Sequence, residues 1–182
     1  MQLKFYPLLF LLFFVEIAHS QVIINEFSAA NMDGITDNYG EREDWIELYN
    51  AGAQTVNLAG YWLSDNPNNP DKWAIPNGVT IQPGEHLLIF ASDRDEFSGG
   101  ILHAGYKITQ TKQEYIVLSD PAQNLLDAIQ ITVPNQVNHS TGRVEDGSSQ
   151  WGIFQNPSPG APNANPRAGY APKPTFNLSP GF

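Results

Sequence analysis

Two glutamates on neighbouring predicted strands, Glu26 and Glu47, are the residues whose type and position could most directly do chemistry. Two carboxyl groups that face each other across strands could act as a glycosidase pair. We favour a structural interpretation, because the sequence implies no cleft around them. Carboxylates on strands more often cap backbone groups or pair with a base such as Arg42 or Arg143.

Other catalytic signatures are missing from the sequence. His86, His103 and His139 have no metal-ligand spacing, and there is no serine elbow, phosphate-binding loop or triad pattern. The chain has no cysteine, which excludes a thiol nucleophile, a thiolate metal site and a disulfide framework. The sequence therefore predicts no catalytic residues and a protein that is not an enzyme.

A polar loop over residues 32–43 and the residue after it carry a group of carboxylates that could bind a hard cation. The candidate ligands are Asp33, Asp37, Glu43 and Asp44. Calcium accepts six to eight oxygen ligands and tolerates irregular loops, but the spacing lacks the ligand alternation of an EF-hand. A solvated loop that keeps an acidic protein soluble is the favoured alternative. A weak calcium site is thus a hypothesis, and no other cofactor is expected.

Aromatic side chains are frequent and could form a binding surface. By strand parity Trp45, Glu47 and Tyr49 point away from Ile46 and Leu48, which makes them candidates for an outer face, and Trp62 is a further candidate. The alternative is packing in the core and sheets, because each aromatic side chain buries 150–250 Å². The full set comprises Trp45, Tyr49, Tyr61, Trp62, Trp73, Tyr106 and Trp151.

The elements that must position these residues are short strands. Residues 44–50 (DWIELYN) alternate with period 2, and we expect them to pair with residues 58–65 (LAGYWLSD) in one antiparallel hairpin. Ile46, Leu48 and Leu63 are predicted core residues. No helix-period segment follows residue 20, and strands recur at short intervals between turn residues. An all-β sandwich is the predicted fold class.

Composition limits the class of partner. Acidic residues number 19 and basic residues 9, so the formal charge is −10, and the basic residues are scattered singly. Nucleic acids and anionic membranes are therefore disfavoured as ligands, because phosphate recognition needs a basic stripe. A protein partner, a neighbouring domain or a polysaccharide stays open.

The two ends of the chain are predicted to lie outside the sandwich. Residues 1–20 combine Lys4, an apolar run and small residues before a cut at Gln21, the pattern of a secretory signal peptide. We expect a secreted, periplasmic or cell-surface protein with no integral membrane segment after cleavage. Residues 21–163 are predicted to form the sandwich, and residues 164–182 a proline-rich linker that begins a truncated following domain.

Several blocks, taken in order, resemble the bacterial lamin tail domain. They are residues 24–27 (INEF), 44–50 (DWIELYN), 58–65 (LAGYWLSD), 73–76 (WAIP), 81–85 (IQPGE), 142–143 (GR) and 157–163 (PSPGAPN). The resemblance covers about residues 21–163 and implies an immunoglobulin-like β-sandwich without catalytic residues. Residues 171–182 resemble the opening strand of the β-domain found at the C-terminus of chitobiase and β-hexosaminidase.

The resemblance implies a non-catalytic interaction module in a larger secreted or cell-envelope protein of bacteria. We expect contact with a protein through a sheet face or an edge strand. The alternative is a carbohydrate-binding accessory module of a secreted hydrolase or of a protein with a spore-coat-type CotH kinase-like domain. An exposed row of aromatic residues would favour the carbohydrate alternative, and a bare apolar edge would favour protein contact.

Overall fold

The computed structural model describes residues 21–172, in which strands are the only regular secondary structure. No helix long and apolar enough to cross a membrane occurs in this part of the chain. The predicted signal peptide and residues 173–182 lie outside the described residues. The strands are β1 (Val22–Ser28), β2 (Trp45–Asn50), β3 (Val56–Asn57), β4 (Trp62–Ser64), β5 (Trp73–Ala74), β6 (Thr80–Ile81), β7 (His86–Phe90), β8 (Glu96–Ser98), β9 (Ile101–His103), β10 (Tyr115–Ser119), β11 (Leu125–Gln130), β12 (Ser140–Arg143) and β13 (Trp151–Phe154).

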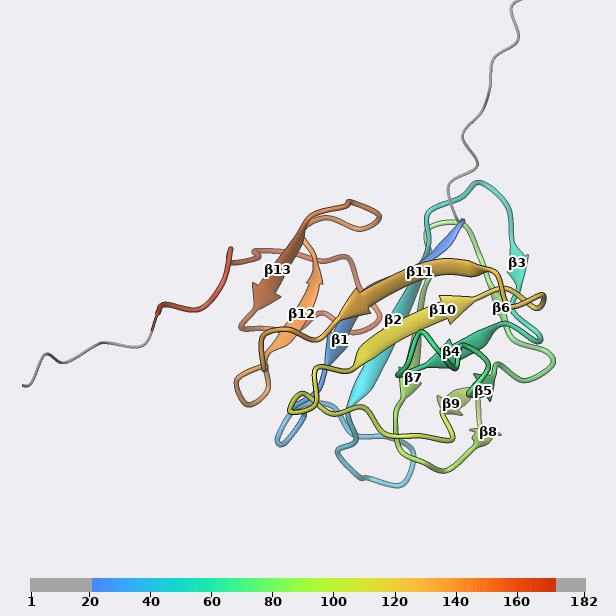
Figure 1. Cartoon of the computed structure of the whole chain (residues 1–182), viewed down its shortest axis with the longest axis horizontal. Helices are drawn as coiled ribbons and strands as arrows, with labels where there is room; N and C mark the ends of the chain where they lie inside the picture. Colours follow the sequence, from blue (N-terminus) through green and yellow to red (C-terminus); the bar gives the residue numbers. More distant parts are fainter. Residues whose placement is uncertain (1–20, 173–182) are drawn as a thin grey trace, which may run out of the picture.

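Two sheets form a sandwich (Figure 1). The larger sheet has seven strands in the order β13-β12-β1-β2-β7-β9-β8, and the smaller has four in the order β11-β10-β4-β5. All neighbours are antiparallel except β7 and β9, which run parallel. Strands β3 and β6 form a separate two-stranded ribbon. The all-β immunoglobulin-like sandwich predicted from the sequence is therefore confirmed.

The core lies between the two sheets and is built by alternate residues of the central strands. In β2, Ile46 and Leu48 are fully buried in the main hydrophobic cluster, as the period-2 pattern predicts. Leu63 of β4 enters the same cluster from the opposite sheet. All three predicted core positions are confirmed.

The predicted hairpin between residues 44–50 and 58–65 is wrong. Strand β2 pairs with β1 and β7 in the large sheet, whereas β4 pairs with β10 and β5 in the small sheet. The chain crosses from one sheet to the other after β3, at a turn that includes Gly60 with a φ of 77°. Two short apolar runs separated by turn residues look the same in sequence whether the chain makes a hairpin or crosses between sheets.

The last strands complete the large sheet beside β1. Strand β12 pairs with β1, and β13 pairs with β12. Beyond residue 163, where a linker was predicted, Arg167 exchanges two backbone hydrogen bonds of 2.8 Å with Ile153. The Tyr170 hydroxyl accepts a hydrogen bond from the Gln136 amide at 2.9 Å. This part of the predicted linker is therefore packed on the sandwich.

Arg143 ties four segments of the fold together. Its Nε donates to the Ile24 carbonyl at 2.7 Å, its Nη2 to Asp127 Oδ2 at 2.7 Å, and its Nη1 to the Ser148 carbonyl. The guanidinium also lies 5.0 Å from the centroid of the Trp151 ring. Asp127 Oδ2 in turn accepts the Ile24 amide at 2.9 Å. One buried side chain thus joins β1, β11, β12 and β13.

Candidate functional site

The two glutamates singled out in the sequence lie side by side on the outer face of the large sheet. Glu26 and Glu47 are directly opposite each other in the β1–β2 pair, next to an irregularity in register at Asn25. Both are fully buried, with 0% of their surface exposed. Their side chains point away from the core, so another segment of the chain must cover them.

That segment is Pro157–Asn163, called the strap below. The Ser158 amide lies 3.3 Å from both carboxylate oxygens of Glu26, and the Ser158 hydroxyl donates to Oε2 at 3.2 Å. The Gly160 amide donates to Glu47 Oε2 at 2.6 Å. The Asn163 amide donates to Asp146 Oδ1 at 3.1 Å. The strap therefore binds three carboxylates, each through a backbone N–H group.

The proline content of the strap explains why each of its backbone N–H groups has a hydrogen-bond acceptor. Three of its seven residues are prolines, which have no N–H group, so only four backbone donors need a partner. Three of the four meet carboxylates, and the fourth, on Ala161, donates to the Ser158 carbonyl at 2.9 Å. Gly160 has a φ of 79°, a conformation that favours glycine. Prolines in the strap thus occupy positions where no N–H donor is needed, and glycine occupies the position with a positive φ.

Burial changes the proton affinity of the paired glutamates. Removal from water raises the pKa of Glu47 to about 8, against the opposing effect of hydrogen bonds from Gly160 and Asn25. Burial also raises the pKa of Glu26, although donors on Ser140 and Ser158 stabilise its charged form. The nearby charge of Asp146 acts in the same direction as burial on both. Both carboxyl groups therefore hold protons more tightly than carboxyl groups in water.

This geometry does not suit a glycosidase pair. A glycosidase needs two carboxyl groups that flank an open space for the sugar, whereas each of these is enclosed and bonded to the protein. Arg143, named as a possible partner, binds Asp127 instead. The favoured interpretation, in which the glutamates cap backbone groups, agrees with the hydrogen bonds from Ser158 and Gly160.

The neighbouring glycine on β12 offers a test of how closely this region is packed. A Cβ atom on Gly142 would lie 3.0 Å from Glu26 Cγ, 3.1 Å from the Asn25 carbonyl and 3.1 Å from Asn163 Nδ2. We expect Gly142→Ala to lower the free energy of unfolding by roughly 1–3 kcal/mol, measured by urea denaturation. Gly169→Ala, where a Cβ would meet no atom within 4 Å, is the matched control. Equal stability of the two variants would contradict the close packing.

The four candidate calcium ligands of the acidic loop have separate partners. Asp33 is exposed and lies 3.3 Å from the Arg42 guanidinium, and Glu43 lies 3.0 Å from Lys107 Nζ. Asp37 Oδ1 accepts the amides of Tyr39 and Glu41 at 2.9 Å. Asp44 Oδ1 accepts the Asn31 amide at 3.0 Å, and burial raises the pKa of Asp44. No group of three or more potential metal-binding side chains is found within residues 21–172.

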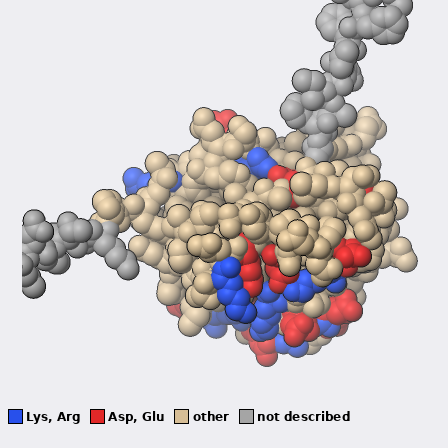
Figure 2. All heavy atoms as spheres, viewed as in Figure 1, with Lys and Arg blue, Asp and Glu red and all other residues tan. Residues whose placement is uncertain are grey.

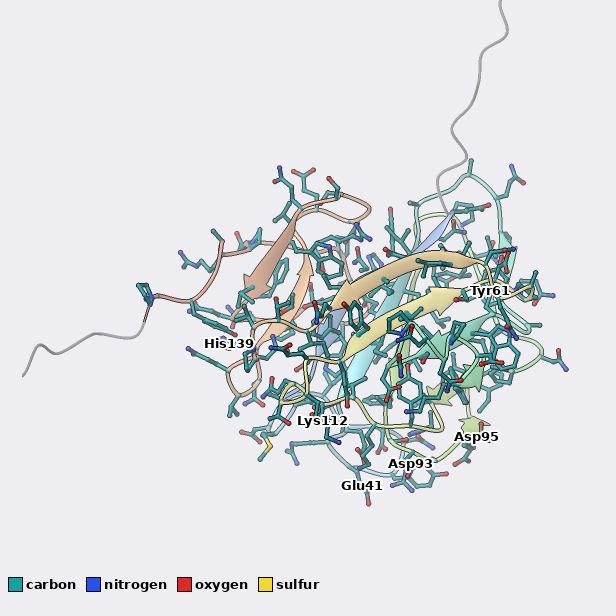
Figure 3. The ribbon with its side chains drawn as sticks, viewed as in Figure 1. Glu41, Tyr61, Asp93, Asp95, Lys112 and His139 are labelled. Atoms are coloured by element: carbon teal, nitrogen blue, oxygen red, sulfur yellow. The ribbon has the colours of Figure 1, made fainter. Side chains whose placement is uncertain are left out.

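The acidic loop belongs to a charged side of the molecule. In Figure 2 the acidic and basic side chains gather at the lower side of this face, and Figure 3 places Glu41, Asp93 and Asp95 along the same rim. His139 lies at the opposite, left-hand side, near β12 and β13. The surface around that end is mostly uncharged in this view.

The candidate binding residues are more buried than strand parity suggested. Trp45 faces outward as predicted but is only 1% exposed, and it lines a hollow together with Pro157 and Pro159 of the strap. The prediction that Trp45 and Glu47 lie at the surface is therefore wrong. Tyr49 is half-buried, with its ring 4.9 Å from that of His86. Trp62 is half-buried in β4, so the four residues form no exposed aromatic row.

A groove that the sequence analysis did not identify lies between β11, an edge strand of the small sheet, and β13, an edge strand of the large sheet. It encloses about 350 Å³ and has no charged residue in its lining. One wall is the end of β11 and the residues after it, the other is β13, and Tyr170 lies at the rim. Val133, 51% exposed, also lines it. The lining residues are Phe27, Ile129, Gln130, Ile131, Thr132, Val133, Thr141, Trp151, Gly152, Ile153, Ala168, Gly169 and Tyr170.

No local signal in the sequence could have revealed this groove. Phe27 and Tyr170 are separated by more than half of the chain, and Tyr170 lies in the proline-rich segment that was predicted as a linker. Only the pairing of β12 with β1 and of Arg167 with β13 brings these residues together. Partly exposed Trp151 and Tyr170 give the groove its aromatic character.

Comparison with known proteins supports the family that the sequence blocks indicated. The sequence model of the lamin tail domain family, a non-catalytic family with an immunoglobulin-like fold, matches residues 16–132. A search of curated proteins finds no match. The family match does not reach residues 171–182, whose resemblance to a chitobiase-type β-domain stays a prediction. Because the match spans more than half of the sequence and the fold agrees with it, this chain belongs to the lamin tail domain family.

Proposed function

We propose that this chain is an interaction module of a larger exported bacterial protein, and that it binds an extended apolar segment of a protein partner in the groove between β11 and β13. The immunoglobulin-like fold of a non-catalytic family supports the general role of an interaction module. The signal-peptide pattern of residues 1–20 supports export, and the absence of cysteine suits a bacterial secreted protein. The groove supports the location of the contact.

The single observation that carries the location is an uncharged groove between two sheet ends. Strand β11 is the last strand of the small sheet, so one of its edges has no strand neighbour within residues 21–172. The apolar side chain of Val133, which lines the groove, is 51% exposed. Exposed apolar surface around a groove is typical of protein-binding sites.

A backbone contact within the chain supports a strand-like segment as the occupant of the groove. Arg167 already forms an isolated β-bridge with Ile153 of β13 through two backbone hydrogen bonds, so the strand that forms one wall of the groove accepts a neighbouring backbone. A partner segment could continue this mode of contact at the edge of β11, in the manner of β-strand addition. The formal charge of −10 favours a segment with basic rather than acidic flanks.

A displayed library of random short peptides tests the proposal. Selected peptides are expected to bind the unmodified chain and to lose roughly tenfold or more in affinity for Val133→Lys, measured by calorimetry. Phe97→Lys is the matched control, because Phe97 is 43% exposed on β8, at the other edge of the large sheet. Equal losses in both variants, or no selected peptide at all, would overturn the location.

A polysaccharide pull-down with the same Val133→Lys variant tests the carbohydrate alternative. Trp151 and Tyr170 are partly exposed aromatic residues on the groove, and aromatic faces can stack on sugar rings. Retention on insoluble chitin or peptidoglycan that is lost in Val133→Lys would point to a glycan and contradict protein binding. The four candidate binding residues Trp45, Glu47, Tyr49 and Trp62 give this alternative no support, because they form no exposed aromatic row.

A further inference from the structure

The strap is held to the sheet chiefly by acidic side chains that are closed off from water. Its amides on Ser158, Gly160 and Asn163 meet Glu26, Glu47 and Asp146 in turn. The two glutamates are fully buried, and the Asp146 side chain is 14% exposed. The side-chain nitrogen of Asn25, Nδ2, donates to two of them, to Glu47 Oε1 at 3.2 Å and to Asp146 Oδ1 at 2.9 Å.

Little positive charge faces this cluster. His86 Nε2 lies 3.1 Å from Asp146 Oδ2, whereas the strap amide of Asn163 meets Oδ1, and the His86 ring makes a tilted contact with the Tyr49 ring. The guanidinium of Arg143 is directed to the Ile24 carbonyl and Asp127, not to the glutamates. The strap carries no titratable side chain, and β12 contributes only the Ser140 hydroxyl, which donates to Glu26.

We propose that the strap is a proton-linked clasp, which closes over Glu26, Glu47 and Asp146 in acidic solution and loosens as the pH rises through neutrality. The closed strap shields neighbouring carboxyl groups from water, and full ionisation would place like charges side by side in that enclosed space. Opening the strap exposes the groups to solvent and relieves this repulsion. A proton on the pair therefore favours closure.

The direction follows from proton linkage. In the open form a glutamate is solvated and ionises in its ordinary range near 4.5, whereas closure raises the pKa of Glu47 to about 8 and that of Glu26 in the same direction. Between these two values the closed form holds a proton that the open form has released. Closure is therefore strongest below pH 4.5, weakens as the pH rises toward 8, and changes little above it.

Amide hydrogen exchange of the full chain tests the clasp without any partner. After correction for intrinsic exchange rates, the protection factors of the Ser158 and Gly160 amides are expected to fall by roughly 100-fold between pH 5 and pH 8.5. The Gly84 amide is the internal control, because it donates to the Asn50 carbonyl at 2.8 Å and not to a carboxylate. Because Gly84 lies in an exposed turn, its exchange through local opening is expected to change much less with pH than exchange of the strap amides.

A variant at Glu47 tests whether this residue causes the pH dependence of strap protection. Glu47→Gln is expected to reduce the pH dependence of the Gly160 protection factor by tenfold or more. Asp44→Asn changes a half-buried carboxylate that accepts the Asn31 amide and does not contact the strap, and it is expected to leave that pH dependence unchanged. The pH dependence of the Ser158 and Gly160 protection factors in the unmodified chain tests the proposal even if a variant folds poorly. Protection of the two strap amides that is constant with pH, or that rises with pH, would overturn the proposal.

Discussion

Replacing Arg143 with methionine is expected to lower the free energy of unfolding by about 3–5 kcal/mol, the largest effect of any single substitution considered for this chain. Methionine keeps most of the apolar stem but removes donors to the Ile24 carbonyl, the Ser148 carbonyl and Asp127. Asp127 would keep its charge in a position where 16% of its side chain is exposed. Urea denaturation at constant pH measures the change.

A matched control and a double variant make this prediction specific. Arg167→Met removes an arginine whose side chain is exposed, and it is expected to change stability by less than about 0.5 kcal/mol. Adding Asp127→Asn to Arg143→Met should recover part of the loss, because the unpaired charge disappears. If Arg143→Met were as mild as Arg167→Met, the role of Arg143 as the link between β1, β11 and β12 would be wrong.

The second large effect is on the pH dependence of stability. The pKa of Glu47 rises from 4.5 to about 8 on folding, so the folded chain binds a proton that the unfolded chain has released in this range. The resulting stability is fully present below pH 4.5 and is lost as the pH rises through about 8. We expect a loss of roughly 3–5 kcal/mol between pH 5 and pH 8.5. Burial of Glu26 and Asp44 acts in the same direction.

Glu47→Gln isolates the contribution of this residue to global stability. The variant resembles the protonated side chain, so its unfolding free energy is expected to change much less between pH 5 and pH 8.5 than that of the unmodified chain. Glu85→Gln, which neutralises an exposed glutamate, is the control and should leave the slope in place. A Glu47→Gln protein with the full pH dependence would show that Glu47 is not its source.

Local periodicity was enough to predict one face of the central strand. Apolar residues at alternate positions of residues 44–50 identified Ile46 and Leu48 as core, because strand side chains alternate between faces regardless of what covers the other side. The same rule placed Trp45 and Glu47 on the opposite face correctly. It could not predict their burial, because the strap that covers them lies more than 100 residues later in the sequence.

Long-range pairing is the part that the sequence did not reveal. Residues 58–65 were expected beside β2, yet the nearest turn leads the chain into the other sheet, where Leu63 pairs with Trp73 and Leu118. A calcium site on the carboxylates of residues 33–44 was a hypothesis beside the favoured solvated loop, and in the structure each of the four candidates contacts a local amide or a basic side chain. The family blocks did include residues 157–163, but a motif of prolines and a glycine does not show which acids it binds.

The strap and the last two strands extend the sandwich beyond the part of the chain matched by the family. The match ends at residue 132, but β12 lies directly beside β1 and Arg167 pairs with β13. Without β12, strand β1 would become an edge of the large sheet. Residues after 132 therefore cover Glu26 and Glu47 and form one wall of the groove.

Glu26 and Glu47 on β1 and β2 form an enclosed structural clasp with the strap and not a solvent-facing site. The most direct measurement is a titration of the Glu47 side-chain carboxyl carbon by ¹³C NMR, assigned with Glu47→Gln. We expect a midpoint near the value of about 8 that burial gives this group, with the strap amides shifting in the same step. A midpoint near the 4.5 of an ordinary glutamate, with no response from the strap amides, would contradict it.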